Sequence, residues 1–233
     1  MRNTTIERVV EPELIDALPP TDPLAIRSRR DLRRVNAWMG NPKIMARALR
    51  QAFPRNPPGR IAEIGAGDGE LLLCVARLLN WRSLNVTLVD RQDILKSDTR
   101  ARFKQMGCEV QPVKGDVFDW LQKPPAGTDV IAANLFLHHF TDEQLRELFR
   151  AAAKTAPAFI AVEPRRTAPC LFFSRLLWFI GCNRVTRHDA VVSVRAGFAG
   201  SELSALWPAS ADWNLTEQPA RFASHLFVAQ RKG

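Results

Sequence analysis

Short apolar runs alternate with amphipathic stretches through the middle of the chain. The amphipathic stretches are typical of helices and fall at about 69–80, 92–106, 117–122 and 142–154. The apolar runs are typical of strands and fall at 60–64, 85–90, 109–113, 129–133 and 158–163. Thr141 and Gln144 have the spacing of a capping box at the start of the last helix. Strands that alternate with helices predict a parallel sheet covered on both faces.

Both ends of the chain depart from this alternation. An apolar stripe predicts a helix over 23–39, and Asn41-Pro42 predicts the N-cap and first position of a second helix. Two strand candidates near the end, 213–217 and 225–230, are joined by a turn containing Pro219 and suit an antiparallel edge hairpin. The predicted fold is therefore α/β and doubly wound. It has a mostly parallel seven-stranded sheet, an antiparallel C-terminal hairpin and an N-terminal helical cap.

These changes of pattern divide the chain into two units. Residues 1–58 are expected to form the helical cap, and residues 59–233 a Rossmann-like domain. The segment 164–200 interrupts the second unit and contains the apolar run 171–182. This run is too short to cross a bilayer, which takes about 20 residues, so it is expected to be buried or to line an apolar pocket.

Charge is the compositional feature that could indicate a partner, because the formal net charge is +9. Part of this positive charge lies between Arg27 and Arg34. These arginines could bind phosphate, nucleic acid or an acidic membrane, or they could simply form an exposed helix face. The N-terminus lacks the apolar core of a secretory signal. Four cysteines without a CxxC pair or a framework spacing fit the reducing cytoplasm. No metal site and no transmembrane segment are expected.

The most specific signal is IAEIGAGDGE at residues 61–70, where a strand gives way to a helix. Glycines let the backbone turn sharply and approach a ligand closely at a helix N-terminus. The dinucleotide fingerprint requires a third glycine where this chain has Glu70. Because Glu63, Asp68 and Glu70 make the loop acidic, it suits a ligand with ammonium and sulfonium charges better than a pyrophosphate.

With this loop the chain resembles the class I S-adenosylmethionine-dependent methyltransferases over about residues 58–165. Open α/β sheets bind ligands at the carboxyl ends of their strands, where an acidic residue about 20 positions past the glycines can accept ribose hydroxyls. The resemblance implies S-adenosyl-L-methionine as cofactor, and it implies that segment 164–200 builds the acceptor pocket. The expected cofactor-binding residues are Glu63, Gly65, Ala66 and Gly67 in the loop, Asp90 and Arg91 at the ribose, Asp116 and Val117 at the adenine, and Asn134 and Leu135 at the methionine end.

A histidine is the expected general base, because methylation of a phenol or of an acidic carbon requires removal of a proton near neutral pH. His139 is the first candidate, since His138 and His139 directly follow the fourth strand. Both could instead cap the next helix or pack under the cofactor. His188 is the second candidate, with Asp189 beside it to orient the ring, although a surface His–Asp contact explains that pair equally well.

The expected reaction is transfer of a methyl group from S-adenosylmethionine to an oxygen, or an activated carbon, of an apolar or aromatic small molecule. One alternative is an RNA or protein methyltransferase that uses the basic cluster Arg27–Arg34. Base-amino methylation is disfavoured because Asn134 is followed by Leu135-Phe136 instead of Pro-Pro-Tyr or Pro-Pro-Phe. The other alternative is a non-catalytic partner subunit that binds the cofactor.

Overall fold

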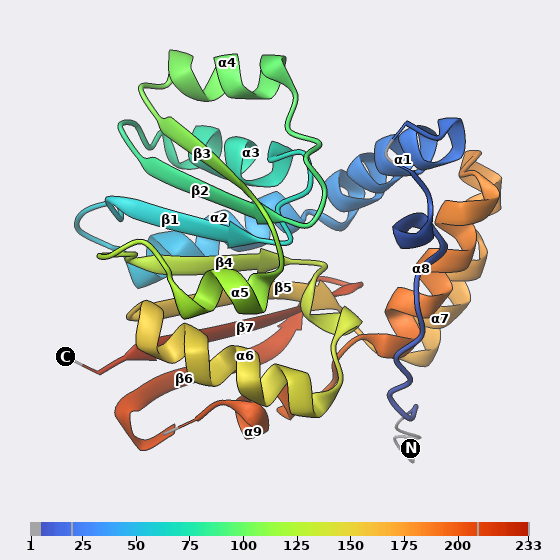
Figure 1. The fold of residues 1–233 in the computed structure, drawn as a ribbon. Coiled ribbons are helices and arrows are strands. Elements are labelled where there is room, and N and C mark those ends of the chain that lie inside the picture. The colour runs from blue at the N-terminus through green and yellow to red at the C-terminus, as the bar shows by residue number, and fades with distance from the viewer. Residues whose placement is uncertain (1–5, 20, 209, 233) are drawn as a thin grey trace.

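The computed structural model describes residues 6–19, 21–208 and 210–232. Within these residues, seven strands form one sheet in the order β3-β2-β1-β4-β5-β7-β6 (Figure 1). Strands β1 to β5 are parallel, whereas β7 is antiparallel to both β5 and β6. The bounds are β1 Arg60–Ile64, β2 Asn85–Asp90, β3 Glu109–Lys114, β4 Val130–Asn134, β5 Ala158–Pro164, β6 Trp213–Ala220 and β7 Ser224–Arg231. The predicted fold class is confirmed.

Helices cover both faces of the sheet (Figure 1). One apolar core lies between the sheet and α5, α6 and α9, and the other between the sheet and α2, α3 and α4. The α-helices are α1 Pro23–Met39, α2 Asn41–Ala52, α3 Glu70–Leu79, α4 Ser97–Gln105, α5 Val117–Gln122, α6 Asp142–Thr155, α7 Ala168–Arg175, α8 Arg184–Ala196 and α9 Glu202–Leu206. The 3-10 helices are η1 Leu14–Ala17, η2 Leu137–His139, η3 Leu177–Ile180 and η4 Ser210–Asp212.

Local signals decide several of these boundaries. The capping box of Thr141 and Gln144 is confirmed at the start of α6. The predicted cap at Asn41 is wrong, because Gly40 in the left-handed region (φ 77°) precedes α2 and Asn41 is already helical. The predicted turn at Pro219 is also wrong. Pro219 lies within β6, an edge strand that tolerates a residue without an N–H, and the chain turns at residues 221–223.

The segment between β5 and β6 begins with a second group of helices. The helices α7, η3 and α8 lie beside α1 and η1, past the carboxyl ends of the parallel strands (Figure 1). The prediction that run 171–182 would be buried or line a pocket is wrong for its aromatic residues. Phe172, Phe173, Trp178 and Phe179 are exposed to solvent. In the described part of the chain, no helix combines the length and the apolar character that crossing a membrane requires.

Candidate active site

The glycine loop after β1 is shaped by left-handed backbone conformations. Gly65, Gly67 and Gly69 have φ values of 65°, 54° and 73°, which side chains other than glycine rarely adopt. A Cβ on Gly65 would come within 2.2 Å of the Phe136 ring, so this glycine is needed for packing as well as for the turn. A Cβ on Gly67 would meet no atom within 4 Å. The backbone at Gly67 is therefore open to a ligand.

Asp90 at the end of β2 holds the loop in place. One carboxylate oxygen accepts a hydrogen bond from the Gly67 amide at 2.8 Å, and the other accepts one from the Gln92 amide at 2.8 Å. Each oxygen keeps a second lone pair, which is what two ribose hydroxyls would need. The structure therefore joins the predicted ribose acceptor directly to the predicted glycine loop.

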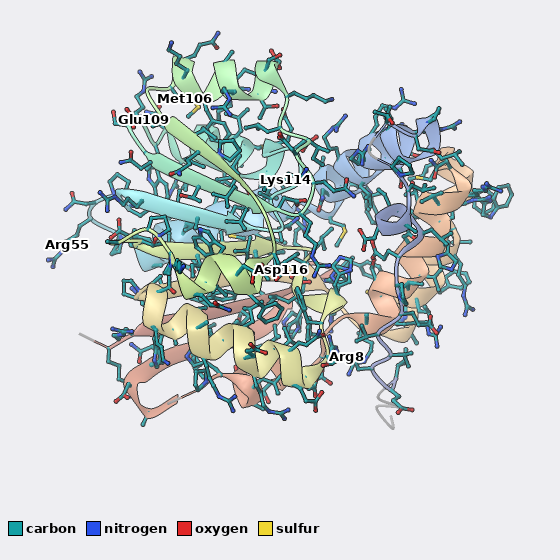
Figure 2. The ribbon with its side chains drawn as sticks, viewed as in Figure 1. Arg8, Arg55, Met106, Glu109, Lys114 and Asp116 are labelled. Carbon is teal, nitrogen blue, oxygen red and sulfur yellow. The ribbon has the colours of Figure 1, made fainter. Side chains whose placement is uncertain are left out.

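Asp116 and Arg91 form an ion pair at the ends of β3 and β2. Arg91 donates to one Asp116 oxygen from Nη2 at 2.5 Å and from Nε at 3.0 Å, and Asp116 also caps α5 by accepting from the Phe118 amide. Burial opposes ionisation of Asp116, but these bonds outweigh it and lower its pKa. Figure 2 shows Asp116 on the side of the sheet that faces α1 and α8. Val117, the next residue, is buried in the apolar core.

Asn134 and Leu135 follow β4, where the methionine end of the cofactor is expected. The Asn134 Oδ1 accepts from Asn41 Nδ2 at 2.9 Å, and Asn41 also accepts from the Ser224 hydroxyl at 2.6 Å. Leu135 has a φ of 49°, an uncommon conformation for a residue other than glycine. Asn41 therefore positions a predicted site residue instead of capping a helix.

A cavity of about 390 Å³ brings several predicted residues together with others that the sequence did not reveal. The predicted residues that line it are Glu63, Gly65, Ala66, Gly67, Asn134 and Leu135. The lining also includes Glu13 from the N-terminal arm, Asn36 from α1, His138 from η2 and Ser193 from α8. Asp90 does not line the cavity itself, but it accepts a hydrogen bond from Gly67, which does. Arg91, Asp116 and Val117 are also not among the lining residues. A glycine loop and a buried polar cluster therefore face the same space.

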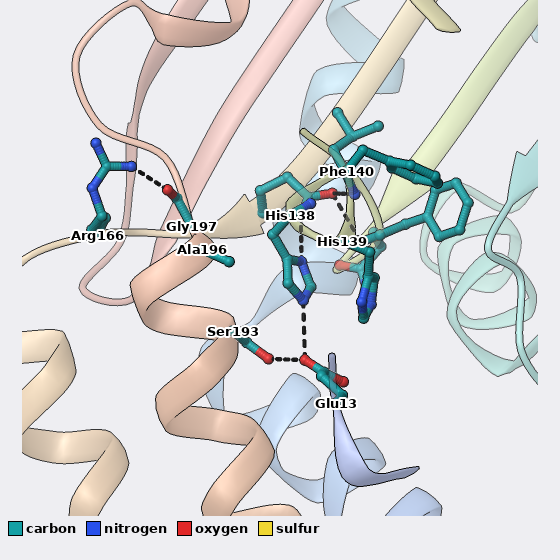
Figure 3. Close-up of polar contacts among 12 residues, drawn as sticks. Glu13, His138, His139, Phe140, Arg166, Ser193, Ala196 and Gly197 are labelled. Atoms are coloured by element: carbon teal, nitrogen blue, oxygen red, sulfur yellow. Dashed lines mark hydrogen bonds and ion pairs between the residues drawn. The ribbon is translucent and has the colours of Figure 1, made fainter. Parts of the chain in front are cut away.

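His138 is the centre of that polar cluster (Figure 3). Its Nδ1 lies 2.9 Å from Glu163 Oε2, and its Nε2 lies 3.3 Å from Glu13 Oε1. Burial alone would lower the pKa of His138, but the two carboxylates raise it to about 9, so the ring is a cation at neutral pH. The same contacts, with a hydrogen bond from Ser193, overcome burial and lower the pKa of Glu13 to about 2.

Glu163 fixes the position of η2 as well as the His138 ring. Its Oε1 accepts from the backbone amides of Phe136 and Leu137 at 3.0 and 2.9 Å. Glu163 itself is completely buried at the end of β5. One carboxylate therefore connects the backbone that follows β4 to the histidine at the cavity wall. The sequence placed Glu163 at a strand end but gave no sign of these partners.

His139, the first candidate base, packs against His138 with ring centroids 4.2 Å apart and ring planes tilted by 32°. Burial and the neighbouring His138 cation lower the pKa of His139 to about 4, so its ring is neutral at pH 7. Its Nδ1 lies 3.8 Å from Asp16 Oδ2. Burial and the charges of Glu13, Asp189 and Asp90 raise the pKa of Asp16 to about 6. The structure thus places a neutral histidine beside the polar cluster of the cavity.

His188, the second candidate base, is like His139 not among the residues that line the cavity. Its side chain is half exposed, and its Nδ1 lies 3.0 Å from Asp189 Oδ1. Asp189 is buried and also accepts from the amides of Leu14 and Ile15, so it anchors η1 to α8. The His188–Asp189 contact therefore lies where the N-terminal arm is attached.

The basic cluster Arg27–Arg34 is partly engaged within the molecule. Arg33 forms a 2.6 Å ion pair with Asp68 of the glycine loop. Arg27 donates to the carbonyl of Gly181, and Arg29 donates to the Gln92 side chain. These contacts attach α1 to the glycine loop on one side and to the segment before α8 on the other.

Comparison with known families assigns this geometry to a class of enzymes. Residues 61–156 match a family described as a methyltransferase domain. These residues run from β1, just before the glycine loop, to the end of α6. The chain therefore carries a class I S-adenosylmethionine-dependent methyltransferase domain, and the predicted resemblance is confirmed. No curated protein matches the sequence at a significant level.

Solved structures with the same fold have low sequence identity to this chain. A plantazolicin methyltransferase in complex with S-adenosylhomocysteine is 13% identical, with a TM-score of 0.64 over 91% of this chain and 92% of that one. A putative O-methyltransferase from Nostoc punctiforme is 14% identical, with a TM-score of 0.62 over 97% and 65%. The mitomycin 7-O-methyltransferase is 18% identical, with a TM-score of 0.58 over 94% and 60%.

The family defines the reaction and the cofactor, and the site fits both. S-adenosylmethionine supplies an electrophilic methyl group on a sulfonium, and the protein catalyses transfer of this group to an acceptor. Among the described residues, the buried Oε2 of Glu63 has no hydrogen-bond partner, although it belongs to a side chain at the cavity wall. A bound ligand with an ammonium group would donate a hydrogen bond to this unpartnered oxygen and would occupy the open space beside the Gly67 backbone.

Cofactor binding is expected to release a proton from Glu63. Burial, followed by the charges of Asp68 and Asp90, raises the Glu63 pKa well above its usual value, and a bound ammonium would lower it again. Affinity for S-adenosylmethionine should therefore rise with pH while free Glu63 titrates. Calorimetry in buffers with different ionisation enthalpies measures the released proton. Glu63→Gln should abolish the release, and an unchanged proton count in this variant would contradict the assignment.

Proposed function

We propose that the protein methylates a hydroxyl oxygen, or an activated carbon, of an apolar or aromatic small molecule. The observation that carries this proposal is the single cavity that holds both the glycine loop and the Glu13–His138–Ser193 cluster. The fold similarity to a mitomycin 7-O-methyltransferase and to a putative O-methyltransferase supports an oxygen acceptor. The macromolecular alternative has in its favour a separate hollow of about 640 Å³ lined by arginines of the basic cluster, but Glu13, His138 and Ser193 are not among the residues that line it.

The N-terminal residues and segment 164–200 cover the acceptor in this proposal. Leu32 and Asn36 of α1 line the cavity from one side, and Ser193 of α8 lines it from another. In this arrangement the N-terminal arm with α1 and the insertion share one task, which is to exclude water from the transferring methyl group, whereas α2, expected to belong to the same cap, packs in the apolar core on one face of the sheet. Apolar side chains beside a few polar groups suit an acceptor with an aromatic body and a hydroxyl.

His139 takes the acceptor proton in the proposed mechanism, because it is the neutral imidazole next to the cluster. One of its ring nitrogens lies within 4.8 Å of both the Glu13 carboxylate and the His138 ring. His138 is a cation whose two ring nitrogens are both held by the carboxylates of Glu13 and Glu163, so it fixes the cluster in place and keeps the adjacent His139 neutral. The loop holds the cofactor, with Glu63 at the ammonium group and Asp90 at the ribose. The protein's main contribution is to align acceptor and methyl group.

The pH dependence of kcat/KM separates the two adjacent histidines. A base must be unprotonated, so a base with a pKa of about 4 leaves the rate flat above pH 5, as we expect for His139. If His138 were the base, the rate would climb tenfold per pH unit up to about pH 9. An inflection near pH 6 that disappears in Asp16→Asn would belong to Asp16. His139→Gln should lower kcat by about 100-fold or more without changing cofactor affinity.

The function itself is tested by S-adenosylhomocysteine release with a panel of acceptors. Phenols, hydroxyquinones and hydroxylated aromatic acids are compared with RNA and with an arginine-rich peptide at equal concentration. Product formation with the first group, and a methyl ether found by mass spectrometry, would support the proposal. Turnover of RNA or peptide alone would replace it with the macromolecular alternative. Cofactor binding without turnover of any acceptor would favour the non-catalytic subunit.

A further inference from the structure

The connection between α7 and α8 exposes an unusual group of apolar side chains. Trp178, Phe179 and Ile180 of η3 are 54%, 66% and 57% exposed, and we call these three residues the aromatic tip. The rings of Trp178 and Phe179 stack on each other at 3.8 Å, so they form one surface. Phe172 and Phe173 on the preceding helix α7 are exposed as well. Exposed aromatic groups of this size mark interaction sites.

Two segments that flank the aromatic tip in the fold carry the excess positive charge of the sequence. Residues 23–40 hold five arginines and one aspartate, and residues 164–200 hold six arginines and one aspartate. The excess of four in the first range and of five in the second accounts for the whole net charge of +9. Both aspartates, Asp31 and Asp189, are buried and bonded to backbone amides. The exposed charge of these two segments is therefore entirely positive.

Contacts within the molecule bring the two basic segments together at the tip. Arg27 donates to the carbonyl of Gly181, the residue that follows the aromatic tip. Next along the chain is Cys182, whose pKa is raised by burial and by Asp31 against the opposing charges of Arg34, Arg27 and Arg187. These arginines thus lie close to the base of the tip from both α1 and α8. Arg184 and Arg187 are exposed on the first turn of α8.

We propose that the aromatic tip and the arginines around it dock the protein on an anionic lipid surface. Tryptophan and phenylalanine insert at the level of the headgroups, while arginines bind lipid phosphates and keep their charge in water. Charge complementarity selects this partner, since an apolar tip beside the exposed Arg184 and Arg187 matches a bilayer whose apolar interior lies beneath anionic headgroups. Docking of this kind requires no membrane-spanning helix. It would place the cavity cover formed by α1 and α8 next to a store of apolar molecules.

Vesicle flotation of the full chain tests this docking. Vesicles of phosphatidylcholine alone are compared with vesicles containing about one-third phosphatidylglycerol, at low and at physiological salt. We expect binding to the anionic vesicles, weak binding to the neutral ones and a decrease with salt. The double variant Trp178→Ser/Phe179→Ser should weaken binding by more than tenfold. Neutralising Arg184 and Arg187 with glutamine should weaken it by about fivefold for each arginine.

Matched surface variants give the test its control. Leu78→Ser removes an exposed apolar residue from α3, and Arg146→Gln removes an exposed cation from α6, so neither should change binding. Trp178→Phe should keep binding but reduce the quenching of tryptophan fluorescence by brominated lipid. Circular dichroism and thermal melting establish that each variant is folded.

Three outcomes would overturn the proposal. The first is equal binding of the tip variant and the native protein to anionic vesicles. The second is a native dimer that the tip substitutions convert to a monomer, which would assign the tip to a second copy of the chain. The third is RNA that binds through the tip and the arginines while anionic vesicles do not bind. Methyl transfer to a water-soluble acceptor is measured in parallel, so that loss of docking is distinguished from loss of activity.

Discussion

Replacing Asp90 by alanine is expected to weaken S-adenosylmethionine binding by two to three orders of magnitude. The variant loses the carboxylate that we propose as acceptor for both ribose hydroxyls, and a hydrogen bond to a charged group is worth about 1.5–3 kcal/mol. It also leaves the Gly67 amide without its 2.8 Å partner, so the loop that faces the cofactor loses its support. Calorimetric titration with S-adenosylmethionine and S-adenosylhomocysteine measures the change.

Asp93 provides the matched control for this substitution. It lies three residues after Asp90 on the same loop, and its side chain is exposed. Asp93→Ala should therefore bind the cofactor like the native protein. If Asp90→Ala also bound normally, Asp90 would not contact the cofactor, and the site at this edge of the sheet would have to be placed elsewhere.

Glu163→Gln is expected to cause the largest loss of stability, about 3–5 kcal/mol. The amide can accept at one oxygen only, whereas the carboxylate accepts from the Phe136 and Leu137 amides and from His138 Nδ1. The substitution also leaves a buried cation with one carboxylate instead of two. For a chain of this size the loss corresponds to a melting temperature about 6–20 °C lower.

The effect of Glu163→Gln should depend on pH in a defined direction. Because folding raises the pKa of His138 from 6.5 to about 9, its interactions stabilise the folded state fully below pH 6.5 and are lost as pH rises through 9. The gap in melting temperature between native protein and variant should therefore be widest at pH 6 and narrow by pH 9. A gap that does not narrow between pH 6 and pH 9 would mean that His138 is neutral in the folded protein.

A second buried histidine–glutamate pair serves as control. His225 Nε2 lies 2.8 Å from Glu217 Oε1, and Glu217 accepts from the Leu203 and Ser204 amides. These residues join β6, β7 and α9 and do not line the cavity. Glu217→Gln should also lower the melting temperature but leave the pH profile of methyl transfer unchanged. Glu163→Gln should change both.

Local sequence patterns were sufficient to predict the sheet. The strands β1 and β2 fall at the predicted residues, because each is a short apolar run bounded by turn residues. Asn41 and Pro219 were misread because their local preferences are outweighed by other contacts. The side chain of Asn41 is used by Asn134 and Ser224, and Pro219 occupies an edge strand where its missing N–H costs little.

The candidate site could be predicted only where it follows the strand ends. The glycine loop, Asp90 and Asn134 each have a local signature, and the structure places them along one edge of the sheet. Glu13 has none, because its partner His138 is 125 residues away in sequence. The sequence also cannot distinguish His138 from His139. Their pKa values shift in opposite directions because the ring of His138 is the one hydrogen-bonded to the two carboxylates. The exposed tip was misjudged because composition does not show which side of a helix is covered.

The N-terminal arm that contributes Glu13 has a consequence for synthesis of the protein. The arm is attached by Arg8, which donates to the Ala196 carbonyl 188 residues later, and by Leu14, which donates to Asp189. Chains grow at about 5–20 residues per second, so α8, to which the arm binds, is synthesised about 10–40 s after the arm. The wall of the cavity is therefore completed late, after the glycine loop and its strands can already have folded. A nascent chain could hold the cofactor loop in place before it is able to enclose an acceptor.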